Sequence, residues 1–349
     1  MIKTTRKIEF PTKVLIIDGL PGCGKTMLSP IVSALDRVEK LTYAFEIENM
    51  CQLVDLGKMD EETAQTMVRI YTDLKLYNMM MGREVNFRMK DLSSVFMDGQ
   101  PWRYVRRIFG PGDETVPDRV AQQKPILHLT THQLLTIGHP VFKALQERLL
   151  LVDVVRHPLY MIKQQALNME KLIADVRFFN VHFEYKGKEI PCWTKGWEDI
   201  FLNSNSVEKA VYSIVRMIQK TQISRDSLPP ELRKNILTVP FEDFVLSPWG
   251  YMEAITSRLE TKIIPATLKM MRKQRVPRQK IAQGLDLPVY RRCGWVPARK
   301  DGDEAQELLE RREWMVKQVD QNAMRIFDEK CKEYEQTYMG GVFSIPGRP

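Results

Sequence analysis

The residues best suited to chemistry form a glycine-rich loop at residues 19–26, Gly-Leu-Pro-Gly-Cys-Gly-Lys-Thr. Glycines let a backbone approach phosphate oxygens closely and turn consecutive N–H groups toward them. Lys25 adds a full positive charge, and a helix that begins beside it adds the positive end of its dipole. An apolar run at residues 14–17 precedes the loop, as a buried strand does in a P-loop protein. The sequence therefore predicts a site for a phosphate-bearing nucleotide.

Two further patterns offer ionisable groups. Asp153 follows an apolar run at residues 149–152. There it could hold Mg²⁺ for phosphoryl transfer or pair with a neighbouring basic side chain. His128 and His132 lie in a segment that is typical of a strand, where their spacing places them about 13 Å apart. One metal ion cannot bridge that distance, so the sequence predicts no zinc site.

Alternating strand and helix patterns must position these residues. The expected strands cover residues 14–17, 41–47, 125–131, 149–155 and 237–240, with Glu46 and Glu48 at the end of the second. The expected helices cover residues 25–38, 60–81, 248–259 and 303–335, and another follows a capping box formed by Asn205 and Glu208. Residues 183–191 read as a hairpin that turns at Lys186-Gly187. This order predicts an α/β fold, a P-loop-containing three-layer αβα architecture with a central, mainly parallel sheet and helical insertions.

Composition limits the class of protein. The chain has 349 residues, of which 44% are apolar, enough for a substantial core. Its five cysteines include no CxxC pair, which argues against a disulfide framework or structural zinc and favours a reducing, cytoplasmic setting. The first seven residues lack the apolar core of a signal peptide. No apolar run is long enough for a membrane span.

The net charge of +8 is concentrated in one segment. Residues 269–300 contain ten Lys or Arg residues and one acid, Asp286, so the segment has a net charge of +9 and the rest of the chain −1. Such a segment either meets an anionic ligand or forms a solvated basic surface.

Three segments beyond the glycine loop resemble sulfotransferases that use 3′-phosphoadenosine 5′-phosphosulfate (PAPS). They are Leu-Thr-Thr-His at 129–132, Arg-His-Pro at 156–158 and Val-Pro-Phe-Glu-Asp-Phe at 239–244, in the family's order. The resemblance covers about residues 14 to 260. It implies transfer of a sulfuryl group from PAPS to a hydroxyl or amine of a carbohydrate or small-molecule acceptor. The product would be 3′-phosphoadenosine 5′-phosphate (PAP), and no metal would be required.

The resemblance also implies roles for individual residues. Lys25 and the loop would stabilise the departing phosphate, Arg156 would hold the 3′-phosphate, and either His132 or Glu48 would act as general base. The residues expected to bind the donor are Gly19, Pro21, Gly22, Cys23, Gly24, Lys25, Thr26, Met27, Arg156, Gln164, Arg291 and Arg292. Arg291 and Arg292 match an Arg-Lys-Gly element of the family. We expect them to bind the donor's 3′ end, because a bisphosphate needs a second cationic site.

Several positions depart from the family's pattern. Lys25 stands where most members have Thr or Ser, and Gly22 where they have Lys or Arg. His157 replaces Asp or Asn, and Gln164 replaces Ser. The intact kinase-type signature leaves open an ATP-dependent kinase of small molecules in which Asp153 holds Mg²⁺. A nucleic-acid-binding NTPase ranks well behind, because no base-stacking module is recognisable, and the sequence predicts no nucleic-acid partner.

We expect one domain, because no linker is evident between two compact parts. Its expected parts, within residues 1–349, are a core at about 12–260 with insertions at about 55–124 and 165–235, then the basic segment 269–300 and a long charged helix at 303–335.

Overall fold

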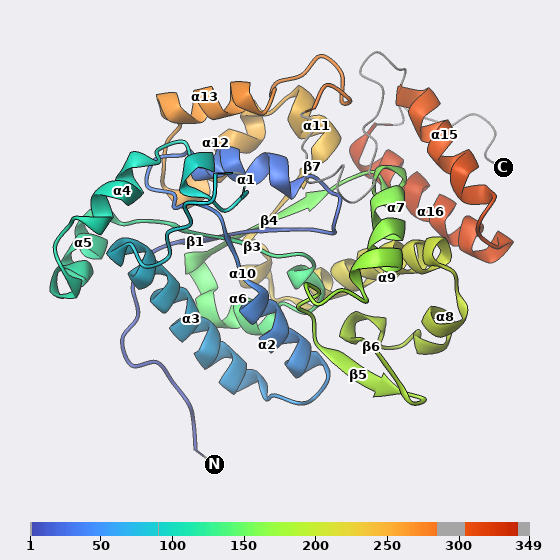
Figure 1. Cartoon of the computed structure of the whole chain (residues 1–349), viewed down its shortest axis with the longest axis horizontal. Coiled ribbons are helices and arrows are strands. Elements are labelled where there is room, and N and C mark those ends of the chain that lie inside the picture. The colour runs from blue at the N-terminus through green and yellow to red at the C-terminus, as the bar shows by residue number, and fades with distance from the viewer. Residues whose placement is uncertain (1, 90, 285–303, 341–349) are drawn as a thin grey trace.

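The computed structural model describes residues 2–89, 91–284 and 304–340 (Figure 1). At the centre of the described residues is a five-stranded sheet with the strand order β2-β3-β1-β4-β7. Its strands are β1 (Val14–Asp18), β2 (Thr42–Tyr43), β3 (Leu127–Thr130), β4 (Leu149–Val155) and β7 (Ile236–Pro240). Neighbouring strands in this order pair in parallel. The C-terminal ends of the strands therefore meet at one edge of the sheet, and the glycine loop follows β1 at that edge.

Helices cover both faces of the sheet, which explains why β1 is apolar on both sides. Leu15 and Ile17 belong to one hydrophobic core, whereas Val14 and Ile16 belong to a second core on the opposite face. This division follows from the two-residue period of a strand. The three-layer αβα arrangement with a parallel sheet is the one predicted from the sequence.

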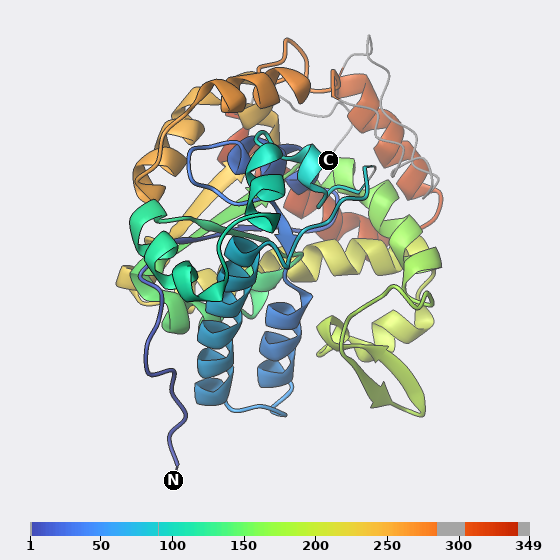
Figure 2. The same ribbon diagram turned by 60° about the vertical axis from the view of Figure 1, so that its left-hand side comes forward.

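The two outer layers differ in the parts of the chain they use. The first core packs against α1 (Lys25–Ser33), α7 (Pro158–Leu167), α8 (Glu198–Asn203), α9 (Ser206–Ser227), α11 (Phe241–Leu246), α12 (Trp249–Leu259), α13 (Pro265–Lys273), α15 (Glu304–Val316) and α16 (Gln321–Tyr338). The second packs against α2 (Phe45–Asp55), α3 (Glu61–Met81), α4 (Trp102–Ile108), α5 (Val116–Gln123), α6 (His139–Leu145) and the short α10 (Pro230–Arg233). Figure 2 shows α2 and α3 side by side below the sheet.

Several local predictions are confirmed. Strand β4 has the predicted bounds. Asp60 caps α3 by accepting the backbone N–H of Thr63 at 2.8 Å, and Asn205 and Glu208 form the predicted capping box of α9. A hairpin of β5 (His182–Tyr185) and β6 (Lys188–Pro191) turns at Lys186-Gly187, where both residues have positive φ. Such a turn matches the twist of a two-stranded ribbon.

Two elements on either side of residue 40 differ from the prediction, one in its type and one in its length. The strand expected at 41–47 ends at Tyr43, and Phe45 begins α2. Glu46 and Glu48 thus lie in the first turn of a helix, where carboxylates complement the helix dipole. The helix expected at 25–38 ends at Ser33, because its last turn tightens into i→i−3 hydrogen bonds such as Ala34 N–H to Ile31.

The long helix expected at 303–335 is instead two helices, α15 and α16. Asp320 separates them, because its side chain accepts the backbone N–H of Ala323 at 2.7 Å and so caps α16. The second helix continues to Tyr338, beyond the predicted end.

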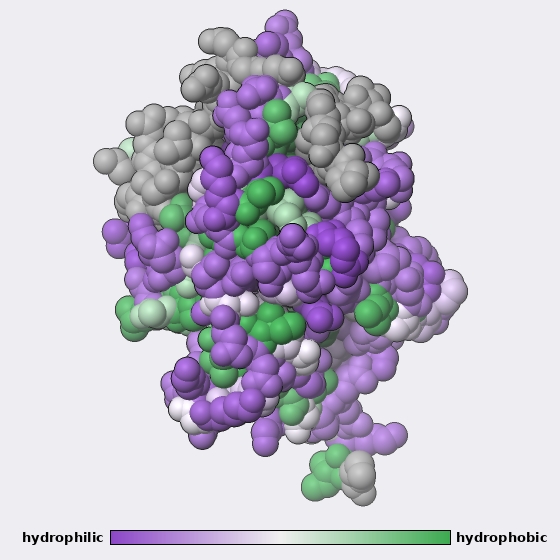
Figure 3. Space-filling view, turned by 90° about the vertical axis from the view of Figure 1, so that its right-hand side faces the viewer, coloured by the Kyte–Doolittle hydropathy of each residue, from purple (hydrophilic) through white to green (hydrophobic). Residues whose placement is uncertain are grey.

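One face of the described surface is shown by hydropathy in Figure 3. The face that carries α15 and the β5–β6 hairpin is mostly hydrophilic, with apolar residues in separate small groups (Figure 3). In the described part of the chain, no helix combines the length and apolarity needed to cross a membrane.

Candidate active site

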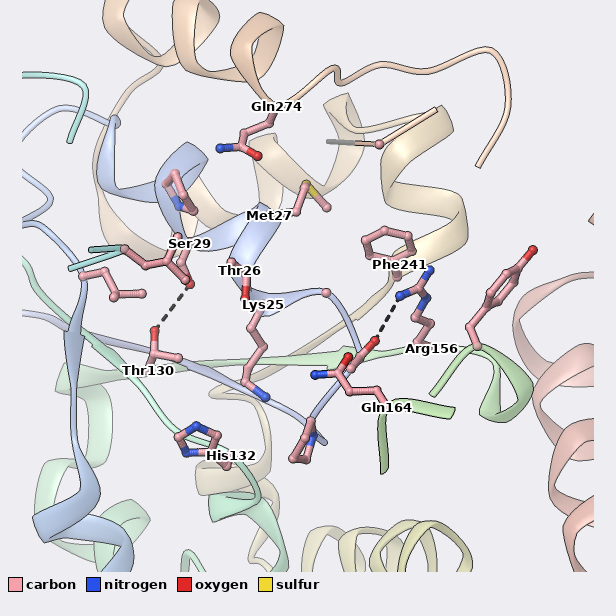
Figure 4. Close-up of a pocket in the computed structure, with 18 of the residues that line it drawn as sticks. Lys25, Thr26, Met27, Ser29, Thr130, His132, Arg156, Gln164, Phe241 and Gln274 are labelled. Atoms are coloured by element: carbon pink, nitrogen blue, oxygen red, sulfur yellow. Dashed lines mark hydrogen bonds between the residues drawn. The ribbon is translucent and has the colours of Figure 1, made fainter. Parts of the chain in front are cut away.

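A cavity of about 390 Å³ opens at the C-terminal edge of the sheet, over the glycine loop (Figure 4). This is the edge at which parallel α/β sheets bind ligands. We call it the loop cavity. The donor-site residues predicted from the sequence that line it are Pro21, Gly22, Gly24, Lys25, Thr26, Met27, Arg156 and Gln164. Gly19 and Cys23 line a second cavity, and Arg291 and Arg292 lie outside the described residues.

Two glycines of the loop are required by close packing. A Cβ atom at Gly24, where φ is +112°, would lie 2.2 Å from the ring of Phe241. A Cβ atom at Gly19, where φ is +134°, would lie 2.3 Å from the carbonyl oxygen of Val154. Gly24 is the N-cap of α1 and offers no side chain to its first N–H groups. The start of α1 therefore presents backbone donors at the cavity, the usual arrangement for binding an anion.

Lys25 folds back onto this loop. Its ammonium donates to the carbonyl oxygen of Gly19 and, at 3.3 Å, to that of Leu20. The side chain is 8% exposed and points into the loop cavity beside Thr26 (Figure 4). A fixed cation thus lies within the glycine turn.

Arg156 follows β4 and faces the glycine loop. Its Nη1 donates to the carbonyl oxygen of Gly22 at 3.0 Å. Its guanidinium lies 4.2 Å from the ring centre of Phe241 and 4.8 Å from that of Tyr160. Its Nε is 3.8 Å from a carboxylate oxygen of Glu242. Two aromatic faces and the loop therefore fix a planar cation at the cavity wall.

Two arginines that no sequence motif indicates extend this positive region. Arg278 lies over the same ring of Phe241, at 5.5 Å, and burial together with the nearby Arg156 and Arg275 lowers its pKa to about 10. Arg311, from α15, is 2% exposed and donates to the carbonyl oxygens of Leu159 and Tyr160. Arg278 belongs to the basic segment noted in the sequence, but a run of charge does not reveal which side chains point inward.

The described lining of the loop cavity is itself cationic, although two of its arginines have carboxylate partners outside the lining. It includes Lys25, Arg156, Arg278 and Arg311, and none of its described residues is an aspartate or glutamate. Arg156 lies 3.8 Å from a carboxylate oxygen of Glu242, and Arg311 pairs with Glu307 at 2.6 Å. Among the described residues, no carboxylate lies within ion-pair distance of Arg278. Buried positive charge without a counterion is stabilised by an anionic ligand.

The two candidate bases meet in one hydrogen-bonded pair. The Nδ1 atom of His132, just after β3, is 3.0 Å from Oε2 of Glu48, and the backbone N–H of His132 donates to Oε1 at 2.6 Å. Glu48 is buried in the first turn of α2. A carboxylate at Nδ1 keeps the proton on that nitrogen and leaves Nε2 as a proton acceptor.

Aromatic rings fix the plane of this histidine. His132 stacks against Phe45 at 5.2 Å and Tyr43 at 6.3 Å between ring centres. His132 and Lys25 lie on the same side of the loop cavity, and Arg156 lies on the other (Figure 4). The cavity therefore has a general-base candidate at one end and paired arginines at the other.

Asp153 does not reach the loop cavity. Its Oδ2 accepts a hydrogen bond from Nη2 of Arg225 at 2.7 Å. Of the two predicted roles, a magnesium ligand or a partner of a basic side chain, the structure shows the second. Asp153 lines a second cavity of about 190 Å³, which we call the rear cavity. Among the described residues, no group of three His, Cys, Asp or Glu side chains is arranged to hold a metal ion.

Comparison with known proteins finds similarity only among solved structures. No model of a known protein family and no curated protein matches the chain. A sulfotransferase domain of the Synechococcus PCC 7002 olefin synthase is 12% identical, with a TM-score of 0.41, over 92% of this chain and 100% of that one. A sulfotransferase of Mycobacterium avium is 12% identical, with a TM-score of 0.42, over 98% and 79%. A mouse sulfotransferase complexed with PAP is 9% identical, with a TM-score of 0.38, over 96% and 88%. All three of these proteins are named as sulfotransferases.

Proposed function

We propose that the chain is a sulfotransferase that moves a sulfuryl group from PAPS to an acceptor. The observation that carries the proposal is the pair of guanidiniums, Arg156 and Arg278, on the ring of Phe241 beside the glycine loop. A nucleotide with phosphate on both the 3′ and 5′ carbons needs two separate anion sites. The loop supplies one, and the arginine pair supplies the other. ATP has no phosphate on its 3′ carbon and leaves the second site without a partner.

The loop suits the 5′ end of this donor. When bound, PAPS supplies the sulfuryl group on its 5′-phosphate. The N–H groups at the start of α1, the Thr26 hydroxyl and the Lys25 ammonium would hold that phosphate and stabilise the charge it gains. Lys25 would exchange its bonds to the carbonyl oxygens of Gly19 and Leu20 for phosphate oxygens. Gln164 and Met27 also line the loop cavity.

The His132–Glu48 pair suits the removal of the acceptor's proton. Nε2 of His132 would accept the proton as the acceptor oxygen forms its bond to sulfur. The buried carboxylate of Glu48 would hold the ring in the required tautomer and stabilise the imidazolium that forms. In this mechanism His132 is the base and Glu48 its partner, so the two earlier alternatives become one unit.

The acceptor is expected to be a hydroxyl compound, such as a carbohydrate or another small molecule. Part of the loop cavity's lining is apolar or aromatic, namely Leu41, Leu92, Leu172 and Tyr43, and Tyr43 stacks on His132. A protonated amine entering there would meet only positive charge among the described lining residues. Because like charges repel strongly where water is scarce, a neutral hydroxyl is favoured over an amine.

The kinase alternative has one favourable feature, the complete signature that ends in Lys25 and Thr26. It lacks support from the acid it needs, since Asp153 is engaged by Arg225 and lines the rear cavity instead. We also propose a reducing, cytoplasmic setting, in which the four described cysteines stay as buried free thiols.

Isothermal titration calorimetry can test the proposal. PAP should bind to the unmodified chain more tightly than ATP with Mg²⁺, and Arg156→Ala should remove that preference. Equal or tighter binding of ATP with Mg²⁺ would overturn the sulfotransferase and favour the kinase.

A further inference from the structure

The C-terminal helix α16 reaches the arginine of the donor site through one intermediate residue. The Tyr334 hydroxyl donates to Oε2 of Glu242 at 2.5 Å. The other carboxylate oxygen, Oε1, accepts the backbone N–H of His157 at 3.3 Å and lies 3.8 Å from Nε of Arg156. Tyr334 and Glu242 are both buried. Tyr334 therefore contacts Glu242, the carboxylate that lies beside Arg156.

The neighbouring residue of α16 makes a second attachment to the same place. Glu335 lies 3.0 Å from Nε2 of the buried His157, and Nδ1 of that ring accepts the backbone N–H of Leu159. His157 directly follows Arg156 and caps α7. Adjacent residues of α16 therefore fix both the backbone after Arg156 and the carboxylate beside its side chain.

We propose that Tyr334 is a positioning residue that keeps Arg156 available to the donor's 3′-phosphate; this rests on the proposed function. Without the hydroxyl, one oxygen of Glu242 would lose its partner in a buried site. The carboxylate would then close the 3.8 Å gap and pair directly with Arg156. A guanidinium bound in that way offers less charge and fewer donors to a phosphate.

The state of the hydroxyl supports this role. Burial, followed by the nearby charge of Glu242, raises the pKa of Tyr334 well above its ordinary value. The phenol therefore remains protonated and donates at all neutral pH values. Arg156 meanwhile keeps its bond to the Gly22 carbonyl, which holds it toward the glycine loop.

The test compares Tyr334→Phe with Tyr338→Phe by calorimetry with two ligands, PAP and adenosine 5′-monophosphate (AMP), which lacks the 3′-phosphate. Tyr338 lies one turn further along α16, with its ring 5.0 Å from that of Tyr334, and it lines the rear cavity together with Arg225. Tyr334→Phe should weaken PAP binding about tenfold, the effect of one lost charge-assisted hydrogen bond. It should leave AMP binding unchanged, and Tyr338→Phe should change neither.

A double variant separates positioning from a general effect on folding. In the Arg156→Ala background, Tyr334→Phe should cause no further loss of PAP affinity, because both changes act on one interaction. The positioning role would be overturned, and the proposed function left standing, by any of three results. These are equal losses of affinity for PAP and AMP, an unchanged PAP affinity in Tyr334→Phe, or a loss that persists when Arg156 is absent. An unmodified chain that binds PAP no better than AMP would overturn the proposed function with it.

Discussion

The two cavities on either side of the glycine loop differ in how their charges are balanced. The described lining of the loop cavity has four cationic side chains and no acid, whereas that of the rear cavity has three acids, Asp18, Asp153 and Glu333, and three bases. In the rear cavity, Asp153 pairs with Arg225 and Lys330 with Glu333. Arg156 is the only described residue that lines both.

This difference separates a candidate binding site from a structural feature. Charges that satisfy one another offer little to a ligand, and removing one partner leaves the other buried and unpaired. Like charges that are held half-buried beside each other, as Arg278 and Arg156 are, destabilise the unliganded protein and are relieved by an anion. Substitutions in the two cavities therefore test this contrast.

Replacement of Lys25 should have the largest effect. Lys25→Met removes the cation within the loop that would stabilise the leaving phosphate, while the buried aliphatic stem keeps a similar volume. We expect the rate of sulfuryl transfer at saturating PAPS to fall about a thousandfold, comparable to the loss of one preorganised charge stabiliser. Single-turnover kinetics measures this step directly. A small loss would show that Lys25 serves the loop's structure only.

Changes to the His132–Glu48 pair should come next. His132→Asn should lower the maximal rate about a hundredfold, the lower range for a general base. Glu48→Gln should lower it less, and the double variant should lose little beyond His132→Asn, because the two act as a unit. Rates for the single and double variants test this. Additive losses would mean that Glu48 has a separate role.

A matched pair of arginine variants tests the contrast between the cavities. Arg278→Gln, in the loop cavity, should weaken PAP binding about tenfold and leave the free energy of unfolding equal or higher. Arg225→Gln, in the rear cavity, should leave PAP binding unchanged and lower the free energy of unfolding by about 3 kcal/mol, since Asp153 loses its partner. Calorimetry and urea unfolding separate the two outcomes. Reversed effects would exchange the roles of the cavities.

The smallest effect concerns the pH dependence of stability. Burial raises the pKa of Asp153 to about 6, although Arg225 opposes the shift. Between the ordinary pKa of about 4 and this raised value, the folded chain binds a proton that the unfolded chain has released. The free energy of unfolding should therefore fall as pH rises through that range. Asp153→Asn should flatten this dependence in urea unfolding, and an unchanged slope would contradict the shift.

Local patterns in the sequence account for the parts that were predicted correctly. The apolar run of β4 and the glycine loop are contiguous signals, so the parallel sheet and the approach of Arg156 to the loop follow from them. The second strand was predicted too long, because its C-terminal part is the start of a helix. The buried residues Ile47 and Cys51 lie at a helical spacing, but the apolar residues before them hid this pattern.

Contacts between distant segments account for what the sequence did not predict. Glu48 and His132 are 84 residues apart, and their pairing depends on how α2 lies against β3. Asp153 and Arg225 are 72 residues apart, so the sequence could not decide between a magnesium ligand and an ion pair. Arg278 joins Arg156 only through the ring of Phe241, which no periodicity reveals.

The central claim is that the arginine pair recognises a phosphate on the 3′ carbon. Its most direct test is the affinity of the unmodified chain for PAP and for AMP, which differ only in that phosphate. We predict that PAP binds about a hundredfold more tightly, the gain from two charge-assisted contacts to one anion. Equal affinities would contradict the account and leave only a general nucleotide site at the glycine loop.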